Sequence, residues 1–505
     1  MAGLGPDCVK RLNQVKCVYQ NYWREQMKRF IQSSDSSQDA LFPEHLEDYV
    51  AADNPARVIE AFVEQLDLNQ LGFKGVKPLA TGRPSYHPAV LLKLYIYGYL
   101  NRIQSSRRLA RETQRNLELF WLTRRLTPAF KTIASFRKAN GAGICKVCSQ
   151  FIMLCRQLNL FVEASVAIDG SKFKAVNNRD KNYTINKIER RREQIEASHK
   201  RYLSAIDTAQ RQEPTDFTEA KIKRLTEKLA TLKEQMARLN SIEVELKKTP
   251  DQQISLTDPD ARSMATSGRG TGMVGYKVQT AVDTKYHLIV AHEVTNVGHD
   301  RNQLANMAKQ AKAALGASEL KVIADRGYFN GEEIRACQEA NIMAFVPKCV
   351  TSGAKAAGRF DKADFIYDAN NNEYRCPAGQ SLIWRYSTVE RELKVHRYWS
   401  SHCQKCEIKA KCTPSPQRRI TRWEHEDIMD AMQLRLDKTP DSMRIRRQTV
   451  EHPFGTLKAW MGATHFLTKR LKNVSTEMSL HVLAYNMKRV INILGAPALM
   501  EAMST

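Results

Sequence analysis

Residues 161–171, with the sequence FVEASVAIDGS, decide how the rest of the chain is interpreted. The run Phe161–Ile168 alternates loosely and is rich in valine and isoleucine, which predicts a buried strand. Asp169 follows the run directly, so the strand would deliver a carboxylate to a cleft. The alternative is that Asp169, which precedes Gly170, serves a turn.

Four further apolar runs predict the rest of a sheet. Tyr276–Val282 and His287–Val294 are expected to form a hairpin. Leu320–Ala324 and Ile342–Val346 are expected to form two later strands, with a helix before each. Three strands, a helix, a strand, a helix and a strand make a mixed α/β sheet covered by helices. Asp325 directly follows the third run, so we expect it beside the earlier strand-end aspartate at one edge of the sheet.

Two other acids in this region are assigned structural roles. Asp283 is expected to serve the turn of the hairpin. Asp300, with Gln303 as its reciprocal partner, is expected to cap the helix that begins near residue 302. Asp325 is harder to dismiss, because Asp325-Arg326-Gly327-Tyr328 joins an acid, a cation, a glycine and an aromatic after a buried strand.

A third acid lies in a basic helix predicted near the C-terminal end. Arg447, Glu451 and Lys458 are separated by four and seven residues, which places them on nearly one face of the helix. Pro453 removes one helical hydrogen bond and is expected to kink the helix. Phosphodiester cleavage with two divalent ions needs carboxylates from different elements, and hard oxygen ligands favour Mg²⁺ or Mn²⁺. We therefore expect Glu451 to join the two aspartates in holding these ions.

The charge of the chain indicates a polyanionic partner. Lysine and arginine number 78 against 54 acids in 505 residues, a formal net charge of +24. A surplus of this size predicts nucleic acid first and an acidic membrane second. Met1–Gln14 lacks an apolar signal segment, and no run approaches the roughly 20 apolar residues of a membrane helix. The 11 cysteines form no regular framework, so we expect no disulfides and a reducing cytoplasm.

Composition and periodicity divide the chain into five parts. These are a helical DNA-binding region at 1–160, a sheet core at 161–184 and 249–354, an inserted helical hairpin at 185–248, a Cys-rich insert at 355–425, and helices at 426–505 that complete the core. A plain helical bundle with a basic face explains the first part as well as a DNA-binding one does. The heptad-like hairpin has three open roles, namely dimerisation, DNA contact and spacing.

The composition of the Cys-rich insert indicates a loop-rich segment, and its cysteines predict a second kind of metal site. Its four cysteines are Cys376, Cys403, Cys406 and Cys412. Four thiolates at such spacing satisfy tetrahedral Zn²⁺, and an insert with little apolar material would gain stability from a structural metal. The alternative is four unpaired thiols in a reducing cell. Arg418, Arg419 and Arg422 lie beside the cysteines and suggest that the insert also touches DNA.

These motifs together resemble the DDE transposases of bacterial insertion sequences. The chain is most similar to the insertion sequence 1182 family, with its insertion-sequence-four-type core, and the resemblance covers most of the chain. It is carried by the Asp169 strand, Asp325–Tyr328 and Arg447–Lys458. The resemblance implies a ribonuclease-H-like core in which Asp169, Asp325 and Glu451 are catalytic and bind Mg²⁺ or Mn²⁺.

The same resemblance implies how DNA is held. It matches Arg447 and Lys458 to a signature of Tyr, Arg, Glu and Lys. Arg444 stands where the tyrosine is usual, and a phosphate contact is still expected there. Arg326 is expected to contact DNA beside the second acid, and the resemblance links Tyr328 to a flipped base near the cut.

The activity that the resemblance implies is transposition. Such an enzyme binds double-stranded DNA at the element ends, cleaves by two-metal hydrolysis and joins the 3′-hydroxyl to target DNA. It would act as a homodimer or higher assembly on DNA, in the bacterial cytoplasm with the nucleoid. Two alternatives remain, a catalytically inactive DNA-binding protein derived from a transposase and a metal-dependent nuclease that does not join strands.

Overall fold

A computed structural model of the chain describes residues 45–78, 84–178, 181–249, 251–265, 272–348 and 353–504. Contacts divide the chain into two units, Met1–Ala51 and Ala52–Thr505. The described part of the first unit holds a short 3-10 helix, η1 (Leu46–Tyr49). All other described elements belong to the second unit. Residues 1–44, part of the expected DNA-binding region, lie outside the described residues.

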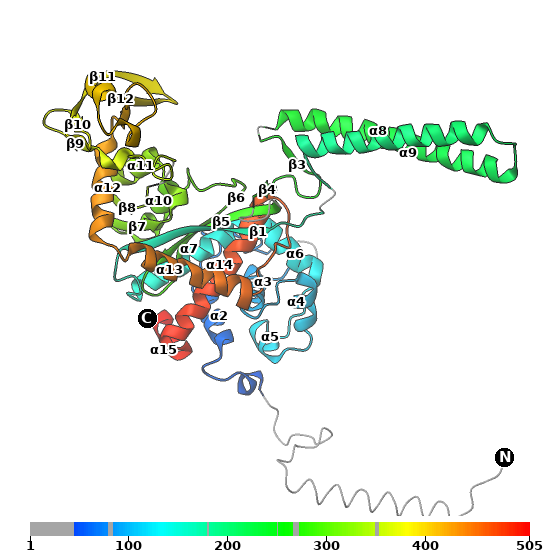
Figure 1. The fold of residues 1–505 in the computed structure, drawn as a ribbon. Helices are drawn as coiled ribbons and strands as arrows, with labels where there is room; N and C mark the ends of the chain where they lie inside the picture. The colour runs from blue at the N-terminus through cyan, green and yellow to red at the C-terminus, as the bar shows by residue number, and fades with distance from the viewer. Residues whose placement is uncertain are drawn as a thin grey trace, which may run out of the picture. The chain divides into compact units, whose positions relative to one another are not determined.

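The central sheet is built around β1, with antiparallel strands on one side of it and parallel strands on the other (Figure 1). Its members are β1 (Ser165–Lys174), β4 (Arg262–Met264), β5 (Met273–Asp283), β6 (Ile289–Thr295), β7 (Leu320–Ala324) and β8 (Ile342–Phe345). On one side β5 and then β6 are antiparallel neighbours, and β4 pairs with the first residues of β5. On the other side β7 and β8 run parallel to β1. The expected mixed α/β sheet is confirmed.

β1 continues beyond the residue at which the sequence pattern ends it. The strand expected to stop at Ile168 runs on to Lys174, because β5 pairs with it throughout and places Thr280 opposite Asp169. On the other side, pairing with β7 ends where Ile168 meets Ala324. Asp169 is therefore a strand residue that no β7 residue pairs with, and the alternative of a turn is excluded.

Helices follow the strands and cover both faces of the sheet. They are α10 (Leu304–Leu315), α11 (Gly331–Glu339), α12 (Glu426–Lys438), α13 (Ser442–Gly455), the π-helical turn η7 (Thr456–Trp460) and α14 (Leu471–Leu494). The last helix, α15 (Ala496–Ser504), packs against α14 and α2. Alternate residues of a strand face opposite sides. Ile168 packs in the core that contains α10, while Asp169 and Ser171 face α13 and η7. The C-terminal helices therefore lie over the face of β1 that carries the first acid.

Six α-helices precede the sheet in the described residues. They are α2 (Pro55–Glu64), α3 (Pro88–Leu100), α4 (Ser106–Glu112), α5 (Leu117–Leu122), α6 (Phe130–Ala139) and α7 (Gly141–Gln157). The apolar segment at residues 88–100 forms α3, and the His87 side chain caps it by accepting a hydrogen bond from Ala89 N at 3.3 Å. Both α3 and α7 pack against α14, so the N-terminal and C-terminal parts of this unit share one core.

α14 carries a buried histidine, His481, whose protonation would lower the stability of the fold. The His481 side chain is 1 % exposed and its ring lies edge-on to Tyr99, with 4.6 Å between ring centres. Burial, with the charge of Arg137 nearby, lowers the pKa of His481 from 6.5 to about 3. The unfolded chain takes up this proton as the pH falls below 6.5, but the folded chain does not, so acid should destabilise the fold. At pH 5 the expected loss from His481 is about 2 kcal/mol.

Guanidinium unfolding at pH 7 and pH 5 measures this loss. In the variant His481→Gln the free energy of unfolding should fall by about 2 kcal/mol less between the two pH values than in the wild type. His199→Gln, on the partly exposed surface of the hairpin, is the control and should keep the wild-type drop. Equal drops in the wild type and His481→Gln would show that the buried ring is not the acid-sensitive group.

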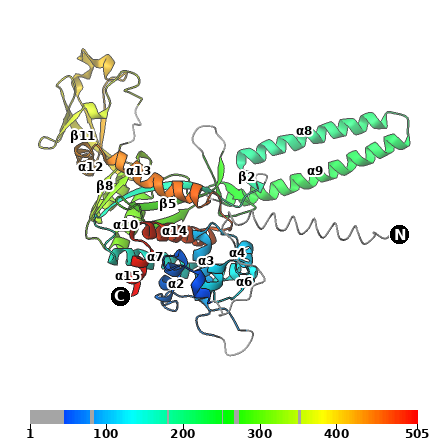
Figure 2. The same ribbon diagram turned by 90° about the horizontal axis from the view of Figure 1, so that it is seen from below.

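The segment expected to form a helical hairpin contains two long helices that lie side by side (Figure 2). These are α8 (Ile185–Gln210) and α9 (Asp216–Lys248). Ile188, Ile195 and Leu239 are buried between them, as the heptad-like spacing predicts. A short two-stranded sheet of β2 (Asn182–Thr184) and β3 (Gln253–Ser255) joins the two ends of the hairpin.

The Cys-rich insert has more regular structure than the expected loops. It contains a five-stranded antiparallel sheet of β9 (Ile366–Asp368), β10 (Glu373–Arg375), β11 (Ser381–Glu390), β12 (Leu393–Trp399) and β13 (Ile420–Trp423). Short 3-10 helices lie between strands, η4 (Lys362–Asp364), η5 (Ser401–Lys405) and η6 (Lys409–Lys411). One face of the sheet buries a small core made mostly of aromatic side chains, including Phe365, Tyr374 and Tyr398. Spaced single aromatic residues gave no strong strand pattern, which is why the sequence suggested loops.

Two general expectations concern the whole chain. Within the described ranges, no helix is both long and apolar enough to cross a membrane. The eight cysteines within the described residues are all free.

Candidate active site

Asp169 and Asp325 occupy equivalent positions on neighbouring parallel strands. Ile168 pairs with Ala324, and an acid follows each of these residues, Asp169 within β1 and Asp325 directly after the end of β7. One guanidinium contacts both carboxylates, because Arg446 Nη2 lies 2.7 Å from Asp169 Oδ1 and 3.5 Å from Asp325 Oδ2. The structure thus brings together the two aspartates that the sequence places at one edge of the sheet.

The negative charge of the Asp169 carboxylate is only partly compensated by its neighbours. Burial raises the pKa of Asp169 to about 6, and the negative charges of Asp325 and Asp300 act in the same direction. Arg446 and the backbone N–H of Gly170, which donates to Oδ1 at 2.8 Å, lower the pKa but do not cancel the effect. One guanidinium cannot neutralise two carboxylates, so the pair attracts a further cation.

A second cation lies along the same face of β1. Lys458 Nζ donates a hydrogen bond to Ser171 Oγ at 2.6 Å, and it lies 4.6 Å from the ring centre of Phe173. Burial lowers the pKa of Lys458, while the nearby Asp169 raises it. Pro453 lies inside α13, and the chain changes to the π-helical turn η7 shortly after it. Lys458 therefore reaches β1 two residues beyond the first acid.

Glu451 is the expected acid that the structure does not join to the other two. Its side chain is exposed on α13, and it makes no hydrogen bond or ion pair with any described residue. Among the described residues, no group of three or more His, Cys, Asp or Glu side chains is arranged to hold a metal ion. α13 nevertheless packs against β1 and β7, the two strands that carry the aspartates.

Asp300 is not the helix cap that the sequence pattern suggests. α10 begins after Gln303, and neither residue caps it with a side chain. The Asp300 carboxylate instead forms an ion pair with Lys277 Nζ and accepts a hydrogen bond from Gln279 Nε2 at 2.7 Å. Lys277 is 4 % exposed, and a buried ammonium is stable only with a counter-charge, which is why this acid turns inward.

Because Gly170 has no side chain, there is room beside it for the network that Asp300 forms with Lys277 and Gln279. A Cβ atom at Gly170 would lie 2.6 Å from Gln279 Nε2 and 2.9 Å from Asp300 Oδ1, closer than real contacts allow. Gly170 follows Asp169 on β1, so the Asp300 network packs directly behind the first acid. Neither the network nor this need for glycine is visible in the sequence, because its members come from separate elements.

Tyr328 belongs to the same network. Its side chain is 0 % exposed, and its hydroxyl donates a hydrogen bond to Gln279 Oε1. The short 3-10 helix η3 (Arg326–Tyr328), which Asp325 caps by accepting from Gly327 N at 2.8 Å, turns the ring into the core. This burial does not fit the expected contact of Tyr328 with a flipped base, and we assign the residue a supporting role.

Removal of the Asp300 carboxylate should destabilise the fold. Asp300→Ala leaves Lys277 buried without a counter-charge, which should cost about 3 kcal/mol in the free energy of unfolding. Adding Lys277→Met should recover most of that loss, since no buried charge then remains. Guanidinium unfolding of the wild type, both single variants and the double variant measures the coupling. A coupling below about 0.5 kcal/mol would contradict the pairing.

The three arginines expected to bind DNA lie at the surface. Arg447 is exposed and makes no hydrogen bond or ion pair within the described residues, whereas exposed Arg444 pairs with Asp441 at 3.1 Å. Arg326 is exposed directly after the second acid.

Arg446, which contacts both aspartates, is not among the site residues predicted from the sequence. The prediction of Arg447 rests on its position four residues before Glu451. Arg446 lies four residues before the buried Val450 and so belongs to the helix face that meets the sheet. That spacing was the available signal.

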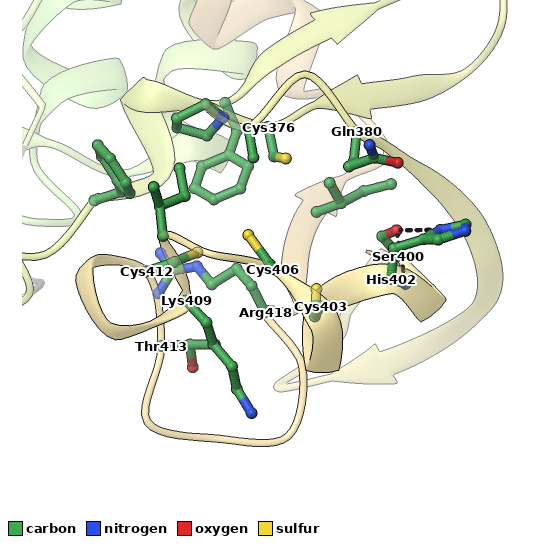
Figure 3. A pocket seen from close by; sticks show the side chains of 16 residues that line it. Cys376, Gln380, Ser400, His402, Cys403, Cys406, Lys409, Cys412, Thr413 and Arg418 are labelled. Carbon is green, nitrogen blue, oxygen red and sulfur yellow. Dashed lines mark hydrogen bonds between the residues drawn. The ribbon is translucent and has the colours of Figure 1, made fainter.

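The four cysteines of the insert line one pocket (Figure 3). Cys376 follows β10, Cys403 lies in η5, and Cys406 and Cys412 follow η5 and η6. Burial raises the pKa of Cys412, and the other three thiols raise it further, which reflects their closeness. They do not form a closed metal-ligand group among the described residues.

The donors at the sheet edge suit a hard divalent cation. Asp169 and Asp325 offer carboxylate oxygens from adjacent strands, and the buried one lacks full charge compensation. Oxygen donors of this kind match Mg²⁺ or Mn²⁺ rather than zinc.

Comparisons with known proteins identify two domains in this chain. Residues 44–139 match the family model described as "Transposase domain (DUF772)", and residues 243–487 match the one described as "Transposase DDE domain". No curated protein matches the chain. A solved structure of the piggyBac transposase synaptic complex with hairpin DNA is 9 % identical and aligns over 90 % of this chain and 79 % of that chain, with a TM-score of 0.30. A TM-score this low supports no argument. The two family matches show that this chain carries a DUF772 transposase domain followed by a DDE transposase domain.

Proposed function

We propose that the chain is the transposase of an insertion sequence, which binds the ends of its element, cleaves phosphodiester bonds there and joins the 3′-hydroxyl ends to target DNA. The observation that carries the proposal is the pair of aspartates on adjacent parallel strands, inside a chain with a DDE transposase domain. The strand order β6, β5, β1, β7, β8, with helices before the last two strands, supports the ribonuclease-H-like core that the sequence resemblance implies. The insertion sequence 1182 family is the specific relationship we propose.

The proposed site holds Mg²⁺ or Mn²⁺ between Asp169, Asp325 and Glu451. The bound ions would activate the attacking water or 3′-hydroxyl and stabilise the leaving oxygen. Glu451 is exposed and unpaired within the described residues, on a helix that packs against both aspartate strands, so it is available to complete the ligand set.

The cations around the site have separate roles in the proposal. Arg446 neutralises part of the charge of the two aspartates and holds α13 against them. Lys458, fixed by Ser171, would hold the phosphate next to the one that is cut. Arg326, Arg444 and Arg447 are exposed and would bind the flanking DNA backbone. The helical region 1–160 would recognise the element end, and two sites acting on two ends imply a homodimer or a higher assembly on DNA.

A strand-joining assay tests this function. The full chain is incubated with Mg²⁺, a target plasmid and a pre-cut duplex that carries the terminal repeat of the element. A transposase should produce joined molecules. Cleavage of an uncut end without joining would point to a simple nuclease, and binding without either reaction to an inactive derivative.

We also propose that the four insert cysteines bind structural Zn²⁺. All four line one pocket, and the insert has only a small core of its own. Four thiolates would complete a tetrahedral site once the two 3-10 turns close around the ion.

Metal analysis tests the zinc proposal directly. Purified protein should contain one zinc per chain, and Cys403→Ser with Cys406→Ser should lose it and expose the insert to protease, because structural zinc supplies folding free energy of about 10 kcal/mol in small domains. Cys145→Ser, in α7, should keep the zinc. Wild-type protein free of zinc after growth in zinc-supplemented medium would contradict the proposal.

A further inference from the structure

On one face of the insert's sheet, two arginine side chains make cation–π contacts with the same tryptophan ring. Arg385 Cζ lies 5.4 Å and Arg419 Cζ lies 5.3 Å from the ring centre of Trp399. Tyr386 meets the same ring edge-on at 5.9 Å, and Ile383 is the pairing partner of Trp399 across β11 and β12. We call these five residues the Trp399 face.

Strand pairing explains why these side chains share a surface. Tyr398 lies opposite Ile420, and both are buried in the small core of the insert. Neighbouring residues on a strand point to opposite sides, so Trp399 and Arg419 point away from that core. Ile383 and Tyr386 are each 45 % exposed there, which gives the face an apolar surface beside its charges.

Among the residues that the structure describes, neither guanidinium group has an acidic partner. Arg419 is exposed and makes no hydrogen bond or ion pair within the described residues. Arg385 donates only to neutral groups, Trp399 O at 3.4 Å and Ser401 Oγ at 3.1 Å. Arg397 on the same sheet is different, because Glu390 neutralises it. Two guanidinium groups that contact the same ring and lack a counter-charge form a candidate anion-binding site.

The other two arginines noted in this part of the sequence face inward. Arg422 is 8 % exposed and bonds to Asp430, and Arg418 stacks over Phe365 in the cysteine pocket. Of the three arginines that suggested DNA contact from the sequence, only Arg419 is free to make it.

The charge of the insert favours a nucleic acid as the occupant. Residues 353–423 contain 14 lysines and arginines against 7 aspartates and glutamates. The planar arginine fork matches a phosphate, and apolar side chains beside it suit the sugar of a backbone. A small free anion would use the guanidinium groups but leave the exposed apolar side chains uncovered.

We propose that the Trp399 face binds the phosphate backbone of double-stranded DNA, with Arg385 and Arg419 on neighbouring phosphates. This inference rests on the proposed function, because it takes DNA as the partner. Within the described residues, no hydrogen bond, ion pair or ring contact joins this face to the three acids, so the face would hold DNA without taking part in the chemistry.

The salt dependence of DNA binding tests this role. Full-length protein is titrated into a fluorescent 30-base-pair duplex of random sequence at several salt concentrations. Arg385→Ala with Arg419→Ala should reduce the slope of log K against log salt by about 2, since each lost phosphate contact removes about 0.9. The affinity at a physiological salt concentration should fall about tenfold or more.

A matched control separates this face from general charge. Arg335→Ala with Arg391→Ala removes the same formal charge outside the face, from the half-exposed Arg335, which pairs with Glu339, and from the exposed Arg391, and it should change the slope by less than about 1. If the two double variants behave alike, or if the Arg385 and Arg419 variant keeps the wild-type slope while the wild type binds and joins DNA, the face proposal alone is overturned. A wild-type chain that binds no duplex at low salt would overturn the proposed function and the face together.

Discussion

Asp169→Asn should lower cleavage of end DNA by about 1,000-fold or more, which corresponds to about 4 kcal/mol of transition-state stabilisation. Asparagine keeps the shape of the side chain but loses the charge that the metal needs. It should not unfold the protein, because burial already disfavours the charged form and raises the pKa of Asp169 to about 6. We therefore expect unchanged or slightly higher thermal stability together with lost cleavage.

The chain offers a matched control for this substitution. Asp283 is also a sheet residue whose pKa burial raises to about 6, but it accepts hydrogen bonds from Lys285 N and Tyr286 N in the hairpin turn. Asparagine can accept the same bonds, so Asp283→Asn should keep near wild-type cleavage. DNA binding is measured in parallel. Wild-type cleavage activity in Asp169→Asn would show that Asp169 is not a catalytic residue.

Glu451→Gln should lower cleavage and joining by at least about 100-fold, or about 2.7 kcal/mol. Because Glu451 is exposed and makes no bond within the described residues, its replacement should change the free energy of unfolding by no more than about 0.5 kcal/mol. A loss of activity in this variant therefore reports on chemistry rather than on folding.

Glu339→Gln controls for the loss of an exposed helical glutamate. Glu339 pairs with Arg335 on the surface of α11, and its replacement should leave cleavage unchanged. Glu451→Gln and Glu339→Gln with equal activity would mean that the third ligand is another residue.

The sheet and its two aspartates could be predicted from the sequence because each follows from a local pattern. An apolar run of strand length ended by an acid needs no knowledge of distant residues. Asp283 was also assigned correctly, since its turn is formed by the next few residues.

The network behind the site could not be predicted in the same way. Asp300 resembles a helix cap in its local sequence, and only the fold places the buried Lys277 beside it. The ring of Tyr328 turns inward because it bonds to Gln279, which is 49 positions away in the chain. Arg446 is one of three arginines within residues 444–447, and only the packing of α13 on the sheet distinguishes it.

The most direct test of the three-acid site is a titration with Mn²⁺, followed by electron paramagnetic resonance, of the full chain bound to pre-cut end DNA. The wild type should bind two ions per chain, and Asp169→Asn, Asp325→Asn and Glu451→Gln should each weaken binding of at least one ion by about tenfold or more. Glu339→Gln should bind as the wild type does. Wild-type affinity and stoichiometry in Glu451→Gln would contradict a site built from these three carboxylates.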